Sequence, residues 1–586
     1  MYFKLITFNG IAPKIEPRLL KNEVGITAEN VNLDPGNLTP LHANSSGATL
    51  NASTITSYYQ YKFGGTTYNL EFDDDVDVVP GPIADDAFDR LYWTGQTFPR
   101  MASSTQITTG GSGAYPRSSF RLGVEAPANA PSAATPTGTD DGTQVKYSTS
   151  YVYTFVTAFG EEGPPSDSSN VVTKVDGQSI VVTMSSTSGS KSNTNYTHKR
   201  LYRSNTGSNT TDFQFVTEVT LATTSFTDSI NNDALGEIIP STFWIAPPDD
   251  DSSLYPNGQM KGLTAVGNGI FAGFSGKRLC FSEPFLPHAW PVAYRITLED
   301  EIVGMCMAGS TLFVGTKGTN YIVAGTDPQG MVLQKVEASE PLLYKKGLVD
   351  MGPYAIYPSA DGLVGIENGQ VTLLTEQLIS TNQWQSSYLD AAYAAGNHEG
   401  KYVAKITNNG VTPSQGFIFD LTGGMNALTT VNALSTHLTT GFFTDPDTHQ
   451  LHLVNKPSSG NCTTEVFAAT SSDSFRTLTF KSKEFVLPKP ASMNFVKVEA
   501  DSYAGSGVTV KVFGDGTEIF DATITASGSV YSATGSAPTS FSATQIQEPI
   551  LRLPTGVHKV YQIEVTSANP IHEICIGESI DELRAI

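Results

Sequence analysis

Short apolar runs separated by turn-forming residues dominate this chain, and long helical patterns are missing. Residues 508–512 alternate apolar and polar side chains, as a strand with one buried face does. Residues 58–63 and 66–72 flank Gly64-Gly65 and predict a hairpin. The 53 Gly and 33 Pro supply the backbone conformations that tight turns require. Together these patterns predict an all-β fold.

A loose repeat begins near Gly262, and each unit consists of a Gly turn, a short apolar strand, a second Gly turn and another strand. Instances lie at residues 263–273, 303–315, 354–366, 401–404 and 448–453. Corresponding strands recur about 40 to 50 residues apart, which is the period of β-propeller blades. The region predicts a β-propeller-like platform. An irregular stack of β-meanders is the alternative, because no WD or kelch signature accompanies the repeat.

Two other segments predict β-sandwiches. Residues 143–245 hold short strands with regular turn signals and resemble a fibronectin type III-like module, and residues 476–586 alternate cleanly between apolar and polar positions. A chain of 586 residues is long enough for roughly three or four domains. We predict four domains: an N-terminal arm with a first propeller-like β unit (residues 1–126) and an inserted fibronectin III-like β-sandwich (residues 127–248), followed by propeller-like blades (residues 249–475) and a C-terminal β-sandwich domain (residues 476–586).

The N-terminal arm, residues 9–40, is extended and punctuated by proline, which biases the preceding residue away from helix. Its apolar side chains need a surface to cover them. We expect the arm to pack on another part of an assembly or to close the propeller ring. The candidate assembly residues are its apolar side chains and prolines: Ile11, Pro13, Ile15, Pro17, Leu19 and Leu20.

The charge balance argues against nucleic-acid binding. Acids outnumber bases 57 to 35 and the net charge is −22, whereas affinity for DNA comes largely from Lys and Arg that neutralise phosphates. The dense basic spots are residues 198–200 with Arg203, and Lys345-Lys346. An acidic surface is compatible with DNA that passes without sticking.

No residue is nominated for catalysis, for a cofactor or for a metal. Three acidic runs, residues 73–75 with Asp77, residues 249–251, and Asp445 with Asp447, lack the glycine and final glutamate of an EF-hand and predict solvated turns. The four cysteines form no CxxC pair and predict ordinary buried thiols. The nine histidines show no metal-binding spacing, and the nucleophile-elbow and phosphate-loop motifs are missing. The sequence thus favours a non-enzymatic protein that needs no cofactor.

The first residues contain no sustained apolar segment of the signal-peptide type, and no apolar run approaches the 18 residues of a membrane span. We therefore expect a protein made and used in a cytosol, or released from one by lysis, with no membrane span.

Three parts of the chain resemble the tail nozzle (tail tubular) proteins of short-tailed bacteriophages. In that family a Gly-x-x-Pro-x-x-x-Pro-x-x-Leu stretch precedes an Ala-x-Asn and a Gly-x-Leu-x-Pro, and residues 10–20, 28–30 and 36–40 match this order. A second similarity is the strand at residues 278–284, which leads to Trp290-Pro291. The third is the ending, at residues 481–485 and 561–565.

The resemblance implies a structural virion protein: a homohexameric ring below the portal and its adaptor ring, with a central channel through which double-stranded DNA passes. It also implies contacts to tail fibres or other tail appendages, a location in the virion tail, and assembly in the host cytoplasm. The fibronectin-like module has no place in the most compact members of the family. A receptor-binding or glycan-cleaving tail protein is the alternative function, and a bacterial adhesin is a further one that the missing signal peptide disfavours.

Overall fold

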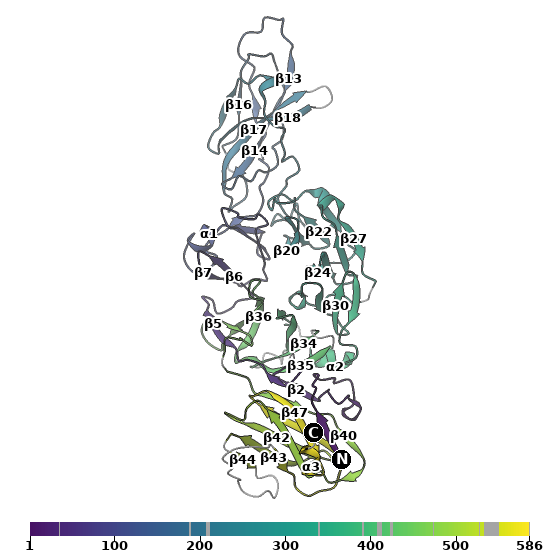
Figure 1. Cartoon of the computed structure of the whole chain (residues 1–586). Coiled ribbons are helices and arrows are strands. Elements are labelled where there is room, and N and C mark those ends of the chain that lie inside the picture. The colour runs from purple at the N-terminus through teal and green to yellow at the C-terminus, as the bar shows by residue number, and fades with distance from the viewer. Residues whose placement is uncertain are drawn as a thin grey trace. The chain divides into compact units, whose positions relative to one another are not determined.

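The computed structural model describes residues 1–33, 36–186, 189–206, 211–337, 340–389, 392–406, 413–421, 426–472, 474–526, 528–531 and 550–584. Regular structure in these residues is almost entirely β, and the longest α-helix, α2 (Thr381–Ser387), has 7 residues (Figure 1). The all-β prediction is confirmed. None of the described helices has the length and apolarity that crossing a bilayer requires.

The chain divides into two compact units. The terminal unit comprises residues 1–60, 308–310 and 336–586, and the central unit comprises residues 61–307 and 311–335. This division differs from the domain boundary that we predicted at residue 126, because residues 1–60 and 61–126 belong to different units.

The central unit is rich in antiparallel sheets whose four strands follow one another along the chain. The strands of three such sheets are β8 (Asp77–Pro80), β9 (Leu91–Thr94), β10 (Arg100–Ala102) and β11 (Phe120–Arg121); β20 (Lys261–Gly267), β21 (Ile270–Ser275), β22 (Arg278–Phe281) and β23 (Arg295–Thr297); and β24 (Ile302–Ala308), β25 (Thr311–Thr316), β26 (Tyr321–Ala324) and β27 (Val332–Lys335). The predicted hairpin also forms, with β6 (Ser57–Phe63) and β7 (Thr66–Phe72) joined by Gly64-Gly65.

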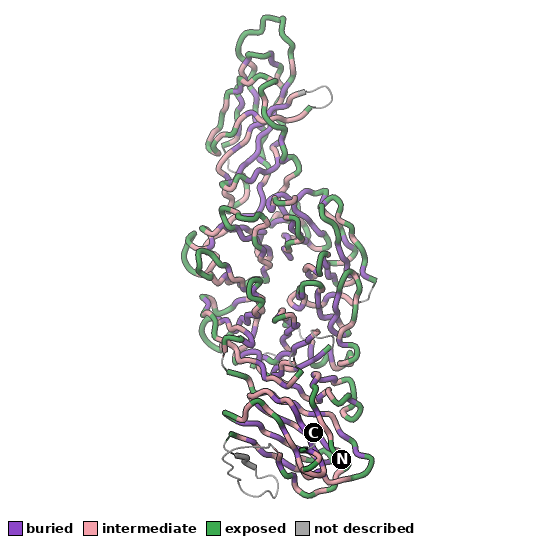
Figure 2. The backbone as a smooth tube through the Cα atoms, viewed as in Figure 1, coloured by how far each residue is buried: buried purple, intermediate pink, exposed green. Residues whose placement is uncertain are grey.

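These sheets share apolar cores. Tyr92 on β9 and Phe271 on β21 lie in one cluster, with their ring centroids 5.5 Å apart. Ile270 on the same strand and Leu312 on β25 lie in another. Strand β21 is buried at all six positions, which explains why its sequence is a largely apolar run and does not alternate. Figure 2 shows buried positions along the strands and exposed positions mainly on the connecting loops. Meanders of four strands that share cores are the units of a β-propeller, and their closure into a ring remains a prediction.

The predicted sandwich domain, residues 127–248, has two three-stranded sheets. They consist of β12 (Ser132–Ala133), β16 (Ile180–Thr183) and β19 (Ser225–Asp228), and of β14 (Tyr151–Thr157), β17 (Tyr196–Thr206) and β18 (Thr211–Thr220). A shorter pair, β13 (Tyr147–Thr149) with β15 (Val172–Lys174), completes the module. Ile180 and Val182 from one sheet and Tyr153 and Leu201 from the other share a core. The fibronectin III-like subtype remains a prediction.

Buried ion pairs join this sandwich to its neighbours within the central unit. Arg90, which precedes β9, donates to Glu161 of the sandwich at 2.9 Å and to Asp86 at 2.7 Å, and all three side chains are almost fully buried. Asp249, which follows the sandwich, pairs with Lys191 of the sandwich and with Arg121 on β11, each at 3.2 Å. Because a buried charge without its partner is costly, separating these pairs is unfavourable, and the pairs fix the sandwich to its neighbours.

The terminal unit repeats the meander pattern. Its strands are β28 (Val349–Asp350), β29 (Ala355–Pro358), β30 (Leu363–Glu367) and β31 (Gln370–Leu373); β32 (Ala395–His398), β33 (Lys401–Ile406), β34 (Ser414–Asp420) and β35 (Ala427–Ser435); and β36 (Leu438–Thr444), β37 (Leu451–Lys456) and β38 (Thr463–Val466). The last of these sheets takes its fourth strand, β5 (Ser45–Thr49), from the N-terminal segment. A segment near the start of the sequence thus completes a sheet whose other strands lie at residues 438–466.

The C-terminal region forms two sheets around a large core, as the sequence predicts. One consists of β1 (Tyr2–Leu5), β47 (Ile571–Gly577), β41 (Phe495–Ala500) and β45 (Ile550–Arg552). The other includes β39 (Leu478–Lys481), β46 (His558–Ser567), β42 (Val508–Gly514), β43 (Thr517–Thr525) and β44 (Gly528–Tyr531), and it continues from β39 through β2 (Thr27–Glu29) to β35, so that the meander of β32 to β35 belongs to the same eleven-stranded sheet. Val496 and Ile574 from the first sheet and Val510 and Ile563 from the second belong to one cluster. The N-terminal strand β1 is an unpredicted member, because it pairs with β47 at the opposite end of the sequence.

Candidate functional site

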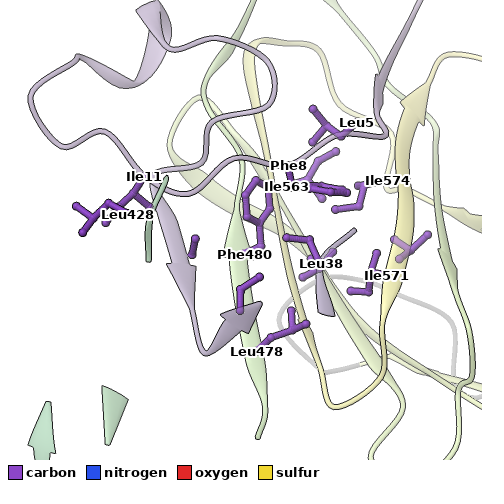
Figure 3. Packing of buried hydrophobic residues seen from close by; sticks show 14 of the residues in the cluster. Leu5, Phe8, Ile11, Leu38, Leu428, Leu478, Phe480, Ile563, Ile571 and Ile574 are labelled. Atoms are coloured by element: carbon purple, nitrogen blue, oxygen red, sulfur yellow. The ribbon is translucent and has the colours of Figure 1, made fainter. Parts of the chain in front are cut away.

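The N-terminal arm, our candidate assembly element, is anchored on the terminal unit. Ile11 is 6 % exposed, and its backbone nitrogen donates to the carbonyl oxygen of Leu428 on β35 at 2.8 Å. Phe8 meets the ring of Phe480 on β39 edge-on, with centroids 5.2 Å apart. Figure 3 shows Ile11 beside Leu428 and Phe8 beside Phe480, so the start of the arm belongs to the core of its own chain.

Gly10 permits this close approach. Its φ of +38° lies in the region that favours glycine, and a Cβ atom there would lie 2.8 Å from the backbone nitrogen of Leu428 and closer still to its carbonyl oxygen. No other residue fits without moving the arm or β35. A steric constraint in this chain therefore explains the first glycine of the motif that resembles the nozzle proteins.

Beyond Ile11 the arm is held by backbone bonds at several points. The Lys14 nitrogen donates to the Leu378 carbonyl at 2.9 Å, and Gln383 of α2 donates its side-chain amide to the Pro13 carbonyl at 3.0 Å. Helix α2 was not predicted. It starts at a capping box, in which the Ser380 hydroxyl and the Gln383 side chain satisfy each other's backbone N–H groups.

The six candidate assembly residues fall into three classes. Ile11 and Leu20 are buried in their own chain, at 6 % and 3 % exposure, and Pro13 and Pro17 are half-buried. Ile15 and Leu19 are 39 % and 67 % exposed. The arm therefore presents two apolar side chains on a loop whose two ends are fixed. We call the exposed pair, Ile15 and Leu19, the arm tip.

Segments that carry the resemblance at the two ends of the sequence meet here. Strand β2 (Thr27–Glu29) pairs antiparallel with β39, and the Ile26 nitrogen donates to the Lys481 carbonyl at 2.8 Å. The Glu484 nitrogen donates to the Pro17 carbonyl at 3.2 Å, and the Lys483 ammonium donates to the Leu20 carbonyl. The Ser482 nitrogen donates to Ile563 on β46 at 2.8 Å. The arm, residues 481–485 and residues 561–565 thus form one structural element.

The acidic runs differ from one another. Asp73, Asp74 and Asp75 are exposed, as a solvated turn requires. At residues 249–251 the prediction is wrong, because Asp249 is buried and the run pairs with Arg121 and Lys191. Asp445 is also buried, at 4 % exposure, and its carboxylate accepts the Asp447 nitrogen at 3.0 Å.

The first basic spot is neutralised inside the sandwich. Lys199 and Arg203 have no exposed surface; Lys199 donates to the backbone carbonyls of Ser185 and Thr223, and Arg203 pairs with buried Asp228 at 2.5 Å. Arg200 pairs with Glu162 and Glu218 at 2.9 and 2.8 Å. Lys199 and Arg203 are therefore not available to bind phosphates, and the charge of Arg200 is balanced by two carboxylates.

In the described ranges no group of three or more His, Cys, Asp and Glu side chains is placed to hold a metal ion. All four cysteines are free thiols, and three of them, Cys280, Cys462 and Cys575, are buried as predicted. Burial and the neighbouring Glu573 carboxylate raise the pKa of Cys575 to about 12, so this thiol stays protonated at neutral pH.

Comparisons with known proteins identify no family. No family model and no curated protein matches the chain. Among solved structures the chain is similar to two crystal structures of the extracellular domain of BT4673 from B. thetaiotaomicron, named once as a one component system and once as a hybrid two component system. Both are 9 % identical, with TM-scores of 0.27 and 0.26, and the matches cover 84 % of this chain and 46 % and 47 % of theirs. The chain thus spans slightly less than half the length of these structures, and such scores define no shared fold.

Proposed function

We propose that the chain is a structural virion protein, a subunit of the tail nozzle of a short-tailed bacteriophage that forms a ring-shaped conduit for DNA ejection. The observation that carries the proposal is the meeting of the arm with residues 481–485 and 561–565 in one element of the terminal unit. These segments lie far apart in the sequence and each resembles the same family. Their contact in the folded chain gives one structural explanation for their joint presence.

The architecture supports a conduit wall. Sheets that share apolar cores resist bending, and strand β5 ties the start of the chain to a sheet formed by residues 438–466. With a net charge of −22, and with Lys199 and Arg203 buried inside the sandwich, the exposed surface repels DNA phosphates on balance. A duplex that slides past such a wall meets little friction.

The partners in this proposal are further copies of the chain in a hexameric ring, the portal-adaptor ring, and tail fibres or other appendages. The arm tip is the contact that we assign to a neighbouring subunit of the virion. Ile15 and Leu19 are presented on a fixed loop, so little conformational entropy is lost when they are covered.

Electron microscopy tests the proposal directly. Antibodies raised against the purified chain are expected to label the tails of virions, and the isolated tails should show a six-fold ring of this protein with a central channel. Label on the capsid or on fibre tips, or the absence of label from virions, would contradict the nozzle assignment. Release of oligosaccharides from host polysaccharide by the purified chain would favour the glycan-cleaving alternative.

A further inference from the structure

A pocket in the central unit has apolar walls and cationic groups, and nothing described so far uses it. Its volume is about 380 Å³. The apolar part of the wall comes from Val124, Pro164, Ile245, Leu254 and Val292. Leu254 and Val292 are 67 % and 62 % exposed, so they stand where the pocket opens to solvent.

Arg295 on β23 lines this pocket and has hydrogen-bonding capacity to spare. Its Nε and Nη2 atoms are shielded from solvent and have no hydrogen-bond partner among the described residues. The Tyr255 ring lies beside the guanidinium, with its centroid 5.7 Å from Cζ, which leaves the N–H edge for an acceptor in the guanidinium plane. Nε and Nη2 form the side of the guanidinium that grips a carboxylate with two parallel hydrogen bonds.

The other charged groups of the pocket are already paired. Arg121 and Lys191 both contact Asp249, and the Glu125 carboxylate accepts the backbone nitrogens of Ser190 and Lys191. Among the described lining residues Arg295 is therefore the cation that contacts no carboxylate, so its charge can be balanced by one negative group of a ligand.

We propose that this pocket binds a peptide segment of a partner protein, in which an Asp or Glu side chain lies next to a bulky apolar residue. The carboxylate would meet Nε and Nη2 of Arg295, and the apolar side chain would lie on Leu254, Val292 and Ile245. Because Nε and Nη2 are shielded, the carboxylate reaches them only after a side chain at the mouth moves, and the exposed Leu254 has the rotamer freedom to do so. The inference does not depend on the nozzle assignment.

The chemistry of the pocket favours a peptide over other ligands. A saccharide needs many hydrogen-bonding groups, whereas the mouth of this pocket is lined by hydrocarbon at Leu254 and Val292. A nucleic acid or a phosphate brings more than one negative charge, and the carboxylates of Asp249 and Glu125 in the same wall oppose the second. One carboxylate beside an apolar group matches both the single available cation and the walls.

A display library of random dodecapeptides, selected on the full-length protein, tests the proposal. Selected peptides should share an acidic residue next to Leu, Ile, Phe or Met. Changing that residue to its amide, or Arg295→Gln in the protein, should weaken binding roughly 10- to 100-fold, because a two-bond charged contact is lost. Arg278→Gln is the matched control: it removes an exposed arginine from the adjacent strand β22 and should leave binding unchanged.

A second pair of variants guards against a folding defect in Arg295→Gln. Leu254→Glu places a negative charge at the mouth and should repel the peptide, whereas Leu254→Gln has nearly the same shape and should weaken binding much less. The proposal is overturned if no peptide is enriched, or if enriched peptides bind Arg295→Gln as tightly as the unchanged protein. It is also overturned if glycans on an array bind the unchanged protein but not Arg295→Gln, while peptides do not bind.

Discussion

Replacing Ile11 or Leu19 by alanine separates the two roles that we assign to the N-terminal arm. Ile11 is 6 % exposed in the core of the terminal unit, and truncating a buried Ile to Ala costs about 2 to 5 kcal/mol through lost burial and the cavity left behind. Leu19 is 67 % exposed, so Leu19→Ala should change the stability of the isolated chain by less than about 0.5 kcal/mol. Subunit assembly, by contrast, should be reduced more directly by Leu19→Ala than by Ile11→Ala.

Hydrogen exchange of the arm amides measures the first effect, because a chain of two units need not unfold in one step. The amides of Ile11, Lys14 and Ile26 donate to other segments of the terminal unit and should be protected. In Ile11→Ala their exchange should accelerate by roughly one and a half to three and a half orders of magnitude, which follows from the same 2 to 5 kcal/mol at about 1.4 kcal/mol per factor of ten. In Leu19→Ala it should be unchanged.

The second effect is measured on assembled particles, by the fraction of protein that enters tails. Leu19→Ala should lower this fraction while the chain stays folded. Equal loss of protection in both variants would refute the division of the arm into a buried anchor and an exposed tip. Normal entry of Leu19→Ala into tails would refute the assignment of the tip to a subunit contact.

Three other perturbations have expected outcomes. Gly10→Ala should lower the melting temperature of the terminal unit more than Gly516→Ala, because both glycines lie in that unit with positive φ but only a side chain at Gly10 strikes backbone; equal shifts would contradict the steric argument. Burial alone would raise the pKa of Asp86, but the Arg90 guanidinium outweighs burial and holds this pKa below its ordinary value. The ionised carboxylate therefore stabilises the folded state above the pKa of the unfolded chain, and this stabilisation is lost as the pH falls below about 4. Asp86→Asn should flatten this acid dependence of denaturant stability, and an unchanged slope would contradict it. Excising residues 127–248 with a short bridge should leave a soluble, folded remainder by circular dichroism, less stable than the whole chain because Arg90 loses Glu161; aggregation of every such variant would show that the module cannot be separated.

Local patterns were sufficient for the class of the fold. The hairpin at Gly64-Gly65 follows from two strand-forming runs and the positive φ that both glycines adopt, at +57° and +76°. The repeat after Gly262 likewise marks real meanders, because turn residues and buried runs act over a few positions. Such features are read from neighbours in sequence, so no knowledge of distant segments is required.

The arm shows where sequence reasoning stops. Ile11, Ile15, Leu19 and Leu20 are equally apolar, and spacing alone does not tell which of them are covered. The structure buries Ile11 beside Leu428 of β35, buries Leu20, whose carbonyl oxygen accepts a hydrogen bond from Lys483, and leaves Ile15 and Leu19 exposed. These contacts come from residues more than 350 positions away. The same holds for Asp249, whose acidic run resembles a solvated turn until Arg121 and Lys191 approach it.

By itself, then, the sequence determined that this protein is a series of short-stranded β modules with an acidic surface and a proline-rich apolar arm, since propensity, turn chemistry and net charge are local or additive properties. Only the tertiary structure decided that β1 joins β47, that β5 completes a sheet near the other end of the chain, and that Lys199 and Arg203 are buried. It also brought Arg295 into one pocket with Val124 and Leu254. These pairings depend on which surfaces are complementary in the collapsed chain, and no single stretch of residues determines that complementarity.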